Sequence, residues 1–247
     1  MGNKNWYVDW FNSPFYHKLY FQRDEKEAAA FIDHLIEHLQ PLPGSRMLDI
    51  ACGKGRYSRQ LSDKGFFVTG IDLAPDSIEY ARQFESDNLE FFQHDMRLPF
   101  RVNYYDYGFN FFTSFGYFAS RREHEDAMRT MAGALKTGGK LIIDYLNPHY
   151  AEDHLIPEEN RQIKDTSYEI HRWQEEGYFF KRIKVTDPTL RQPIEYTERV
   201  MKFSLGDFTE MLAYEHFQVK EVFGNYALQP YDVRKSPRLI VIAEKYQ

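Results

Sequence analysis

The first 146 residues alternate between helix-like and strand-like patterns of apolar positions. Residues 24–40 repeat apolar side chains at helical spacing, which predicts an amphipathic helix. Five strands are predicted by short apolar runs, at 46–51, 66–72, 89–95, within 104–118 and at 140–146. Between these runs, helices are predicted at 57–65, 74–84 and 121–137. Such alternation predicts parallel β-α-β units, and therefore an α/β protein whose open sheet carries helices on both faces.

Two local signals define the last of these helices. Ser120 and Glu123 have the spacing of a capping box, which predicts that a helix begins between them. Gly138 and Gly139 predict that the same helix ends just before the fifth strand.

After residue 148 the pattern changes to strand-like segments with no crossover-length helix between them. Segments at 168–174, 177–185 and 194–204 predict a small antiparallel meander. A helix and two strands follow, at 207–217, 218–226 and 236–245, and these strands could rejoin the main sheet. We therefore predict an N-terminal helical arm or lid (1–40), a core (41–149 and 206–247) and an antiparallel β insertion (150–205). The insertion would cover the active site or form a dimer surface.

Composition narrows the class of partners. The net charge is −6 and no long basic run is present, which disfavours a nucleic-acid partner. Cys52 is the only cysteine, so no intramolecular disulfide can form, and a reducing compartment is expected. No signal peptide or membrane-spanning stretch is apparent. These features predict a cytoplasmic protein with no membrane partner; a homodimer is left open.

The loop "MLDIACGKGRYS" (47–58) follows the first predicted strand and contains Gly53 and Gly55. A triphosphate-binding P-loop is excluded because the terminal Lys-Ser/Thr pair is missing. A dinucleotide fingerprint would need a third glycine where Ser58 stands, so this alternative survives only on the two glycines and Asp72. Asp72 itself is one of three acids at predicted strand ends.

These three acids, Asp49, Asp72 and Asp95, are spaced 23 residues apart. Because the carboxyl ends of parallel strands share one edge, they predict a ligand site there. The segments "LDIACGKGR", "GIDLAPDSIEYA" and "QHDMR" resemble motifs I, II and III of the class I S-adenosylmethionine-dependent methyltransferases, over about residues 46–145. The resemblance implies a doubly wound, mostly parallel, seven-stranded Rossmann-like sheet and S-adenosylmethionine as cofactor.

The resemblance also assigns roles in the first motif. It implies that Asp49 anchors the first turn. The backbone at Ala51, Gly53 and Gly55 would lie beside the amino-acid end of the cofactor. Cys52 is expected to be a small packing residue rather than a nucleophile.

Motifs II and III are implied to hold the nucleoside. Asp72 would accept hydrogen bonds from both ribose hydroxyls, and Leu73 would lie against the adenine face. Asp95 would accept from the adenine amino group, and Met96 would complete that pocket. Each acid has a simpler interpretation as a helix cap or turn residue, but three in register favour binding.

The acceptor side is predicted less directly. By the resemblance, Asn110 and Thr113 line the methionine portion of the cofactor and the path to the acceptor. The aromatic-rich arm is either a packed helix or a lid, in which Tyr16 touches the cofactor and Arg23 binds its carboxylate. His17 is the candidate general base, with an ordinary helix histidine as the alternative.

The resulting prediction is a methyltransferase that acts on a small metabolite by in-line displacement. An RNA or protein methyltransferase and a non-catalytic S-adenosylmethionine-binding protein remain as alternatives. No metal is expected.

Overall fold

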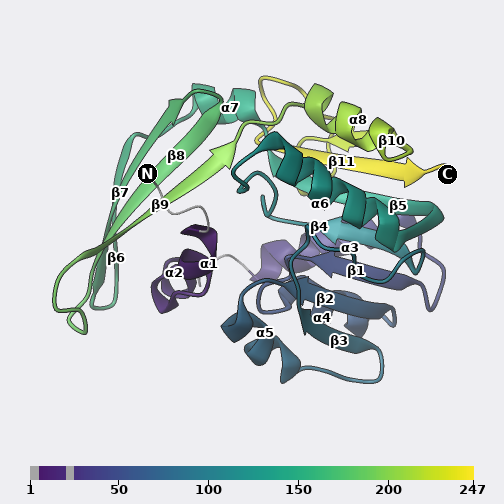
Figure 1. Ribbon diagram of the computed structural model, residues 1–247, viewed down its shortest axis with the longest axis horizontal. Coiled ribbons are helices and arrows are strands. Elements are labelled where there is room, and N and C mark those ends of the chain that lie inside the picture. The colour runs from purple at the N-terminus through teal and green to yellow at the C-terminus, as the bar shows by residue number, and fades with distance from the viewer. Residues whose placement is uncertain (1–5, 21–24) are drawn as a thin grey trace.

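The computed structural model of the chain describes residues 6–20 and 25–247 (Figure 1). Seven strands form the main sheet, in the order β10-β11-β5-β4-β1-β2-β3. Their bounds are Arg46–Ile50 (β1), Phe67–Asp72 (β2), Leu89–Gln93 (β3), Tyr105–Asn110 (β4), Leu135–Leu146 (β5), Phe217–Phe223 (β10) and Arg238–Lys245 (β11). Only β11 runs antiparallel to its neighbours, β5 and β10. The predicted seven-stranded, mostly parallel sheet is confirmed.

Helices cover both faces of this sheet, so the doubly wound arrangement is confirmed as well. They are α3 (Glu25–Leu39), α4 (Arg56–Asp63), α5 (Pro75–Arg82), α6 (Arg121–Ala134) and α8 (Leu205–Tyr214). One apolar cluster joins the sheet to α3, α4 and α5 through Phe31, Leu61 and Ile78. The other joins it to α6 and α8 through Met128 and Phe208. Central strands therefore have both faces buried, as parallel strands require.

The junction of α6 and β5 differs from the prediction. The capping box is present: Ser120 accepts from the Glu123 backbone, and Glu123 accepts from Ser120. However, α6 ends at Ala134, and β5 already begins at Leu135, so the predicted end at Gly138 and Gly139 is wrong. These glycines lie inside β5, where the pairing with β4 shifts register. Gly138 permits this irregularity, because its φ of 79° is one that glycine adopts without strain.

The insertion after β5 begins with the short helix α7 (Pro148–Asp153) and continues as an antiparallel sheet in the order β6-β7-β8-β9. Its strands are Glu158–Ile163 (β6), Thr166–Glu175 (β7), Tyr178–Thr186 (β8) and Ile194–Met201 (β9). The antiparallel insertion is confirmed, but the predicted three-stranded meander lacked β6. That strand reads "EENRQI", which has no apolar alternation, and its pairing with β7 defines it.

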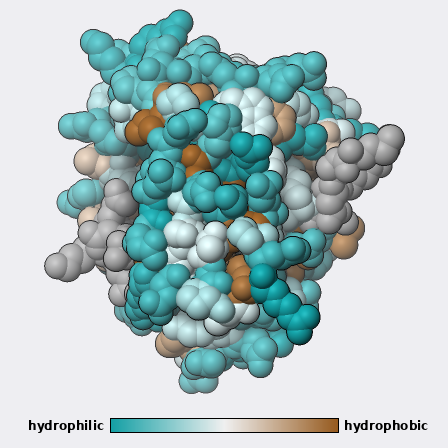
Figure 2. All heavy atoms as spheres, turned by 90° about the vertical axis from the view of Figure 1, so that its left-hand side faces the viewer, coloured by the Kyte–Doolittle hydropathy of each residue, from teal (hydrophilic) through white to brown (hydrophobic). Residues whose placement is uncertain are grey.

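The arm helices α1 (Trp6–Phe11) and α2 (Pro14–Tyr20) lie between the insertion and the main sheet (Figure 1). Trp10 and Leu19 share an apolar cluster with Tyr168 and Ile183 of the insertion. Figure 2 shows the molecule from the side of the insertion, where hydrophilic residues cover most of the face and hydrophobic ones form small separate areas. Among the helices of residues 6–20 and 25–247, none is long and apolar enough to cross a membrane.

Candidate active site

A cavity of about 480 Å³ lies between the arm and the edge of the main sheet where β1, β2 and β4 end. Ten of the predicted site residues line it: Tyr16, His17, Asp49, Ala51, Gly53, Asp72, Leu73, Asp95, Met96 and Thr113. Gly55 and Asn110 are not in its lining, and Arg23 lies outside the described residues. A second hollow, on β6 and β7, contains no predicted site residue.

Glycine is required at positions 53 and 55 of the first loop for different structural reasons. Both have left-handed φ angles, 55° at Gly53 and 73° at Gly55. A Cβ at Gly53 would meet no atom within 4 Å, so the loop leaves open space at this position. A Cβ at Gly55 would lie 2.5 Å from the Phe91 ring, so close packing accounts for this glycine. Of the two glycines, therefore, only Gly53 lines the cavity.

Asp49 is buried beneath the loop, with 1% of its surface exposed. The Ser58 hydroxyl donates to its Oδ2 at 2.5 Å. Burial raises the pKa of Asp49 to about 7, although the Ser58 hydrogen bond opposes the shift. Ser58, in the first turn of α4, therefore holds the Asp49 carboxyl group in place. From the sequence alone, Ser58 is only the residue that replaces the third glycine of a dinucleotide fingerprint.

Asp72 ends β2 and ties two neighbouring segments together. Its Oδ2 accepts from the Gly53 backbone N–H at 2.8 Å, and its Oδ1 accepts from Ala74 N–H at 2.8 Å. Burial raises its pKa, while these backbone hydrogen bonds lower it. Each carboxylate oxygen can accept a second hydrogen bond, so capacity for a ligand's hydroxyl groups remains.

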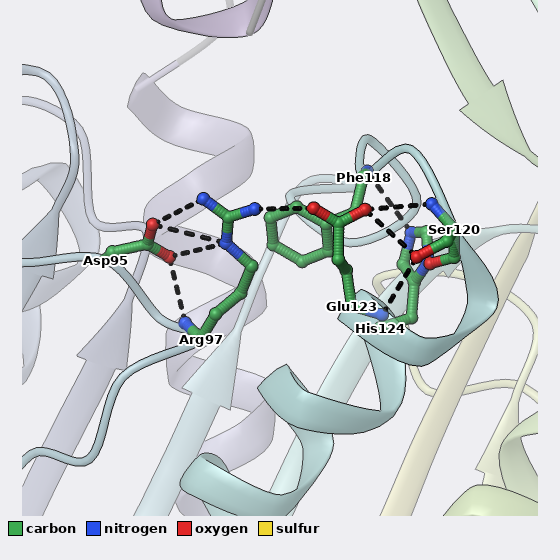
Figure 3. A network of polar contacts seen from close by, with 6 residues as sticks. All are labelled: Asp95, Arg97, Phe118, Ser120, Glu123 and His124. Carbon is green, nitrogen blue, oxygen red and sulfur yellow. Dashed lines mark hydrogen bonds and ion pairs between the residues drawn. The ribbon is translucent and has the colours of Figure 1, made fainter. Parts of the chain in front are cut away.

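Asp95 follows β3 and is paired with Arg97 (Figure 3). The closest contact joins Arg97 Nη2 to Asp95 Oδ2 at 2.7 Å, and the Arg97 backbone N–H donates to Oδ1 at 2.9 Å. Burial would raise the pKa of Asp95, but the Arg97 contacts outweigh it and hold this pKa below its usual value. Between the two residues, the Met96 carbonyl accepts from the Thr130 hydroxyl of α6. The carboxylate is therefore ionised and held in place.

The loop after β4 has a strained backbone where it lines the cavity. Phe112 and Thr113 have φ angles of 66° and 58°. Residues other than glycine adopt such left-handed angles only at a cost in free energy. Asp144 of β5 compensates: its Oδ2 accepts from Phe112 N–H at 3.0 Å, and its carbonyl accepts from Thr113 N–H at 3.1 Å. Arg238 completes the arrangement by donating to Asp144 at 2.7 Å and to Thr113 Oγ1 at 3.2 Å.

Sequence reasoning missed Asp144 and Arg238. The available signal was a single acid inside the apolar run "LIIDYL", a position where an unpaired charge is costly. Asn110, which was predicted, instead donates to the Ile50 carbonyl at 3.0 Å and thereby joins β4 to β1. Its Oδ1 is buried without a hydrogen-bond partner among the described residues.

The arm forms the opposite wall of the cavity. Its lining is mainly aromatic and includes Tyr7, Phe11, Tyr16 and Tyr20, together with Tyr117 and Phe118 from the loop before α6. His17 Nε2 is buried and has no hydrogen-bond partner in the part of the chain described. Burial, with the nearby Lys54 charge, lowers the pKa of His17 to about 4. This imidazole is therefore neutral at pH 7.

The polar and aromatic side chains that line this cavity fit a sulfonium nucleoside. Carboxylates lie at the strand ends, and aromatic rings, which attract a cation, lie opposite them. The open space at Gly53 admits close approach of a ligand to the backbone. No cluster of three or more metal-binding side chains occurs among the described residues.

A doubly wound α/β fold with a ligand cavity at the carboxyl edge of its sheet defines the Rossmann-like class of cofactor-binding proteins. The family model for a methyltransferase domain matches residues 42–184, more than half of the chain. The chain therefore belongs to this methyltransferase domain family and is a class I S-adenosylmethionine-dependent methyltransferase, as its motifs predicted. The prediction of S-adenosylmethionine as the cofactor is therefore confirmed at the level of this methyltransferase class.

Known proteins agree with this assignment. Putative methyltransferase YqeM of Bacillus subtilis (strain 168) is 33% identical over 105 residues, which are 40% of this chain and 41% of that protein. The chain spans about half the length of the curated relatives it matches first. An S-adenosylmethionine-dependent methyltransferase from Clostridium acetobutylicum ATCC 824 has a TM-score of 0.78 at 16% identity, covering 94% of this chain and 97% of that one.

CalS10, an amino pentose methyltransferase from Micromonospora echinaspora, has a TM-score of 0.69 at 18% identity. The match covers 94% of this chain and 97% of that one. At such identities the two solved structures establish a shared fold, and the acceptor of this chain is a separate question.

Proposed function

We propose that the protein transfers a methyl group from S-adenosylmethionine to a nucleophilic atom of a small molecule by in-line displacement. The observation that carries the proposal is the wall opposite the sheet. There, α1, α2 and Glu198 of β9 line the same cavity as Asp72 and Asp95. An acceptor must fit beneath these elements, which favours a metabolite over a folded RNA or protein.

The cofactor would be held by the residues that the motifs predicted. Asp72 would accept from the ribose hydroxyls, Asp95 from the adenine amino group, and the backbone beside Gly53 would approach the amino-acid end. When bound, S-adenosylmethionine supplies an electrophilic methyl group on a positively charged sulfur. The chain's own contribution is alignment of the acceptor and exclusion of water by the aromatic wall.

His17 would act as general base where the acceptor must lose a proton. Its Nε2 has no protein partner in the described structure, and its low pKa keeps it neutral at physiological pH. A base with a pKa near 4 is weak, so this role suits an acceptor that is already nucleophilic. A neutral amine nitrogen would meet this condition.

We assign the arm helices α1 and α2 (residues 6–20) and the insertion (150–205) to one cover over the core (41–149 and 206–247). We assign α3, the last part of the predicted arm (1–40), to the core, because its Phe31 packs against the main sheet. The arm packs against the insertion through Trp10 and Leu19. The outer face on the insertion side is mostly hydrophilic (Figure 2). This favours a role of the insertion as a cover, rather than as a dimer surface.

Binding and transfer measurements test the proposal. Titration calorimetry should show binding of S-adenosylmethionine and S-adenosylhomocysteine, and no binding of NAD. Incubation with tritiated methyl donor and a pool of small metabolites should then label the small-molecule fraction. Label found only in added RNA or protein would overturn the small-molecule acceptor. Cofactor binding without transfer to any fraction would favour a non-catalytic role.

A further inference from the structure

The carboxylate of Asp95 is held by the residue two positions along the chain. Arg97 Nε lies 3.1 Å from Oδ1 and 3.2 Å from Oδ2, and Arg97 Nη2 lies 2.7 Å from Oδ2. The backbone N–H of Arg97 adds a fourth contact, to Oδ1 at 2.9 Å. Both oxygens are therefore engaged from one side, and rotation of the carboxylate would break several hydrogen bonds together.

Arg97 is itself attached to a regular element. Its Nη1 donates to Glu123 Oε1 at 2.9 Å. The other oxygen of Glu123 accepts from the Ser120 backbone N–H at 2.9 Å, within the capping box of α6. Figure 3 shows this continuous chain of contacts from Asp95 to the beginning of the helix. The orientation of Asp95 thus depends on α6, the helix that begins next to the cavity.

The arginine also packs within the cavity wall. Its guanidinium carbon lies 4.9 Å from the centroid of the Phe118 ring, and Phe118 lines the cavity beside Asp95 and Met96. Side-chain exposure is 25% for Arg97 and 19% for Asp95. The pair is shielded enough for its geometry to be maintained, while the carboxylate still faces the cavity.

We propose that Arg97 is a positioning residue that gives the nucleoside pocket its preference for a 6-amino purine over a 6-oxo purine. This inference rests on the proposed function, in which Asp95 meets the purine edge. An ionised carboxylate can only accept hydrogen bonds, so it attracts an amino group and repels a carbonyl oxygen. Held rigidly by Arg97 and Glu123, it cannot rotate to relieve that repulsion.

Lysine cannot reproduce this arrangement, because it has no planar fork of donors. In Arg97→Lys the carboxylate would be free to turn. Affinity for the amino purine would then fall, and the penalty on the oxo purine would become smaller.

The test compares S-adenosylhomocysteine with S-inosylhomocysteine, which differ at the 6-position, by titration calorimetry on the full chain. We expect Arg97→Lys to weaken S-adenosylhomocysteine binding about 10- to 100-fold, the range for a lost hydrogen bond to a charged group. The preference between the two ligands should fall by a similar factor. Glu123→Gln, which keeps the side-chain shape, should shift both quantities less and in the same direction.

Arg121→Lys is the matched control. Arg121 is in the first turn of the same helix and is paired with Asp207 at 3.1 Å and Glu210 at 2.7 Å, away from the cavity. It should retain wild-type affinity and preference.

Thermal unfolding of each variant separates a loss of stability from a loss of selectivity. If Arg97→Lys and Glu123→Gln lower the melting temperature but keep the wild-type preference, Arg97 is a structural brace and the inference is wrong. If Arg97→Lys does not fold, Glu123→Gln alone decides, and an unchanged preference in it overturns the inference. A wild-type protein that binds neither ligand would instead overturn the proposed function.

Discussion

Asp49 places an ionisable group where its charge is unfavourable. Its carboxyl group has one side-chain donor, Ser58, and its pKa is raised to about 7 by burial. In an unfolded chain the same group titrates near 3.9. The folded state therefore holds the proton more tightly, and this group's contribution to stability declines as pH rises from about 4 to about 7.

We expect Asp49→Asn to remove that decline. Urea unfolding of the wild type and the variant, measured between pH 4.5 and pH 8, should give curves that diverge in favour of the variant as pH rises. Curves that stay parallel would show that Asp49 titrates normally in the folded protein.

His17 gives a second prediction at the level of a single side chain. Replacing it by alanine removes the neutral imidazole from the cavity wall but leaves Asp72 and Asp95 unchanged. We expect His17→Ala to keep cofactor affinity and to lower methyl transfer by about 100-fold, the lower end for a general base. The readout is tritium transfer to the small-molecule fraction. His216→Ala, on a histidine outside the cavity lining, should behave as wild type, and full transfer by His17→Ala would dismiss the role.

At the level of elements, β5 and β11 supply the support for the strained loop after β4. Asp144 is fully buried and accepts from Phe112 N–H, from Arg238 and, at 3.0 Å, from the Tyr226 hydroxyl. Because β5 and β11 are adjacent and antiparallel, Arg238 lies close enough to pair with Asp144. The two strands therefore maintain a cavity wall that the loop could not maintain alone.

We expect Arg238→Met to destabilise the protein by about 3–5 kcal/mol, because it leaves a buried carboxylate without its charge partner. Denaturant unfolding measures this change. Arg234→Met is the control: Arg234 pairs with Asp153 at the surface, and such pairs contribute about 0–1 kcal/mol. Equal effects of the two substitutions would contradict the importance given to the buried pair.

At the level of the whole molecule, the arm and the insertion share an apolar cluster built around Trp10. Trp6 and Phe11 of the arm pack both against this cluster and against the cluster that joins α6 and α8 to the main sheet. Trp10 is the largest fully buried side chain of the shared cluster, and its Nε1 donates to Glu198 Oε1 at 2.7 Å. Its ring centroid lies 4.5 Å from that of Tyr196. These contacts join α1 of the arm to β9 of the insertion, so the proposed cover depends on Trp10.

We expect Trp10→Ala to release this cover while the main sheet stays folded. Amide hydrogen exchange should rise in residues 6–20 and 194–201 and remain slow in β1 and β4. Trp173→Ala is the control, because Trp173 stacks on Phe180 within the insertion and does not belong to the shared cluster. A uniform rise across the main sheet after Trp10→Ala would show that the cover does not open separately.

Much of the fold and part of the site follow from local patterns. Apolar periodicity predicted the strands and helices of the main sheet, and the spacing of Asp49, Asp72 and Asp95 predicted the edge at which the cavity lies. The Ser120–Glu123 capping box was also readable, since it involves residues three positions apart. These features depend on neighbours along the chain, so one sequence contains the information needed to find them.

Contacts between distant residues could not be found in the same way. Trp10 meets Glu198 across 188 positions, and Arg238 meets Asp144 across 94, while β6 is defined by its pairing with β7 rather than by its own residues. The spacing of residues within a short segment cannot predict such pairs, because burial and strand register are established only when the chain packs. The sequence by itself determined the sheet and its cofactor edge; packing determined how the acids are paired, how the loop after β4 is held and what covers the cavity.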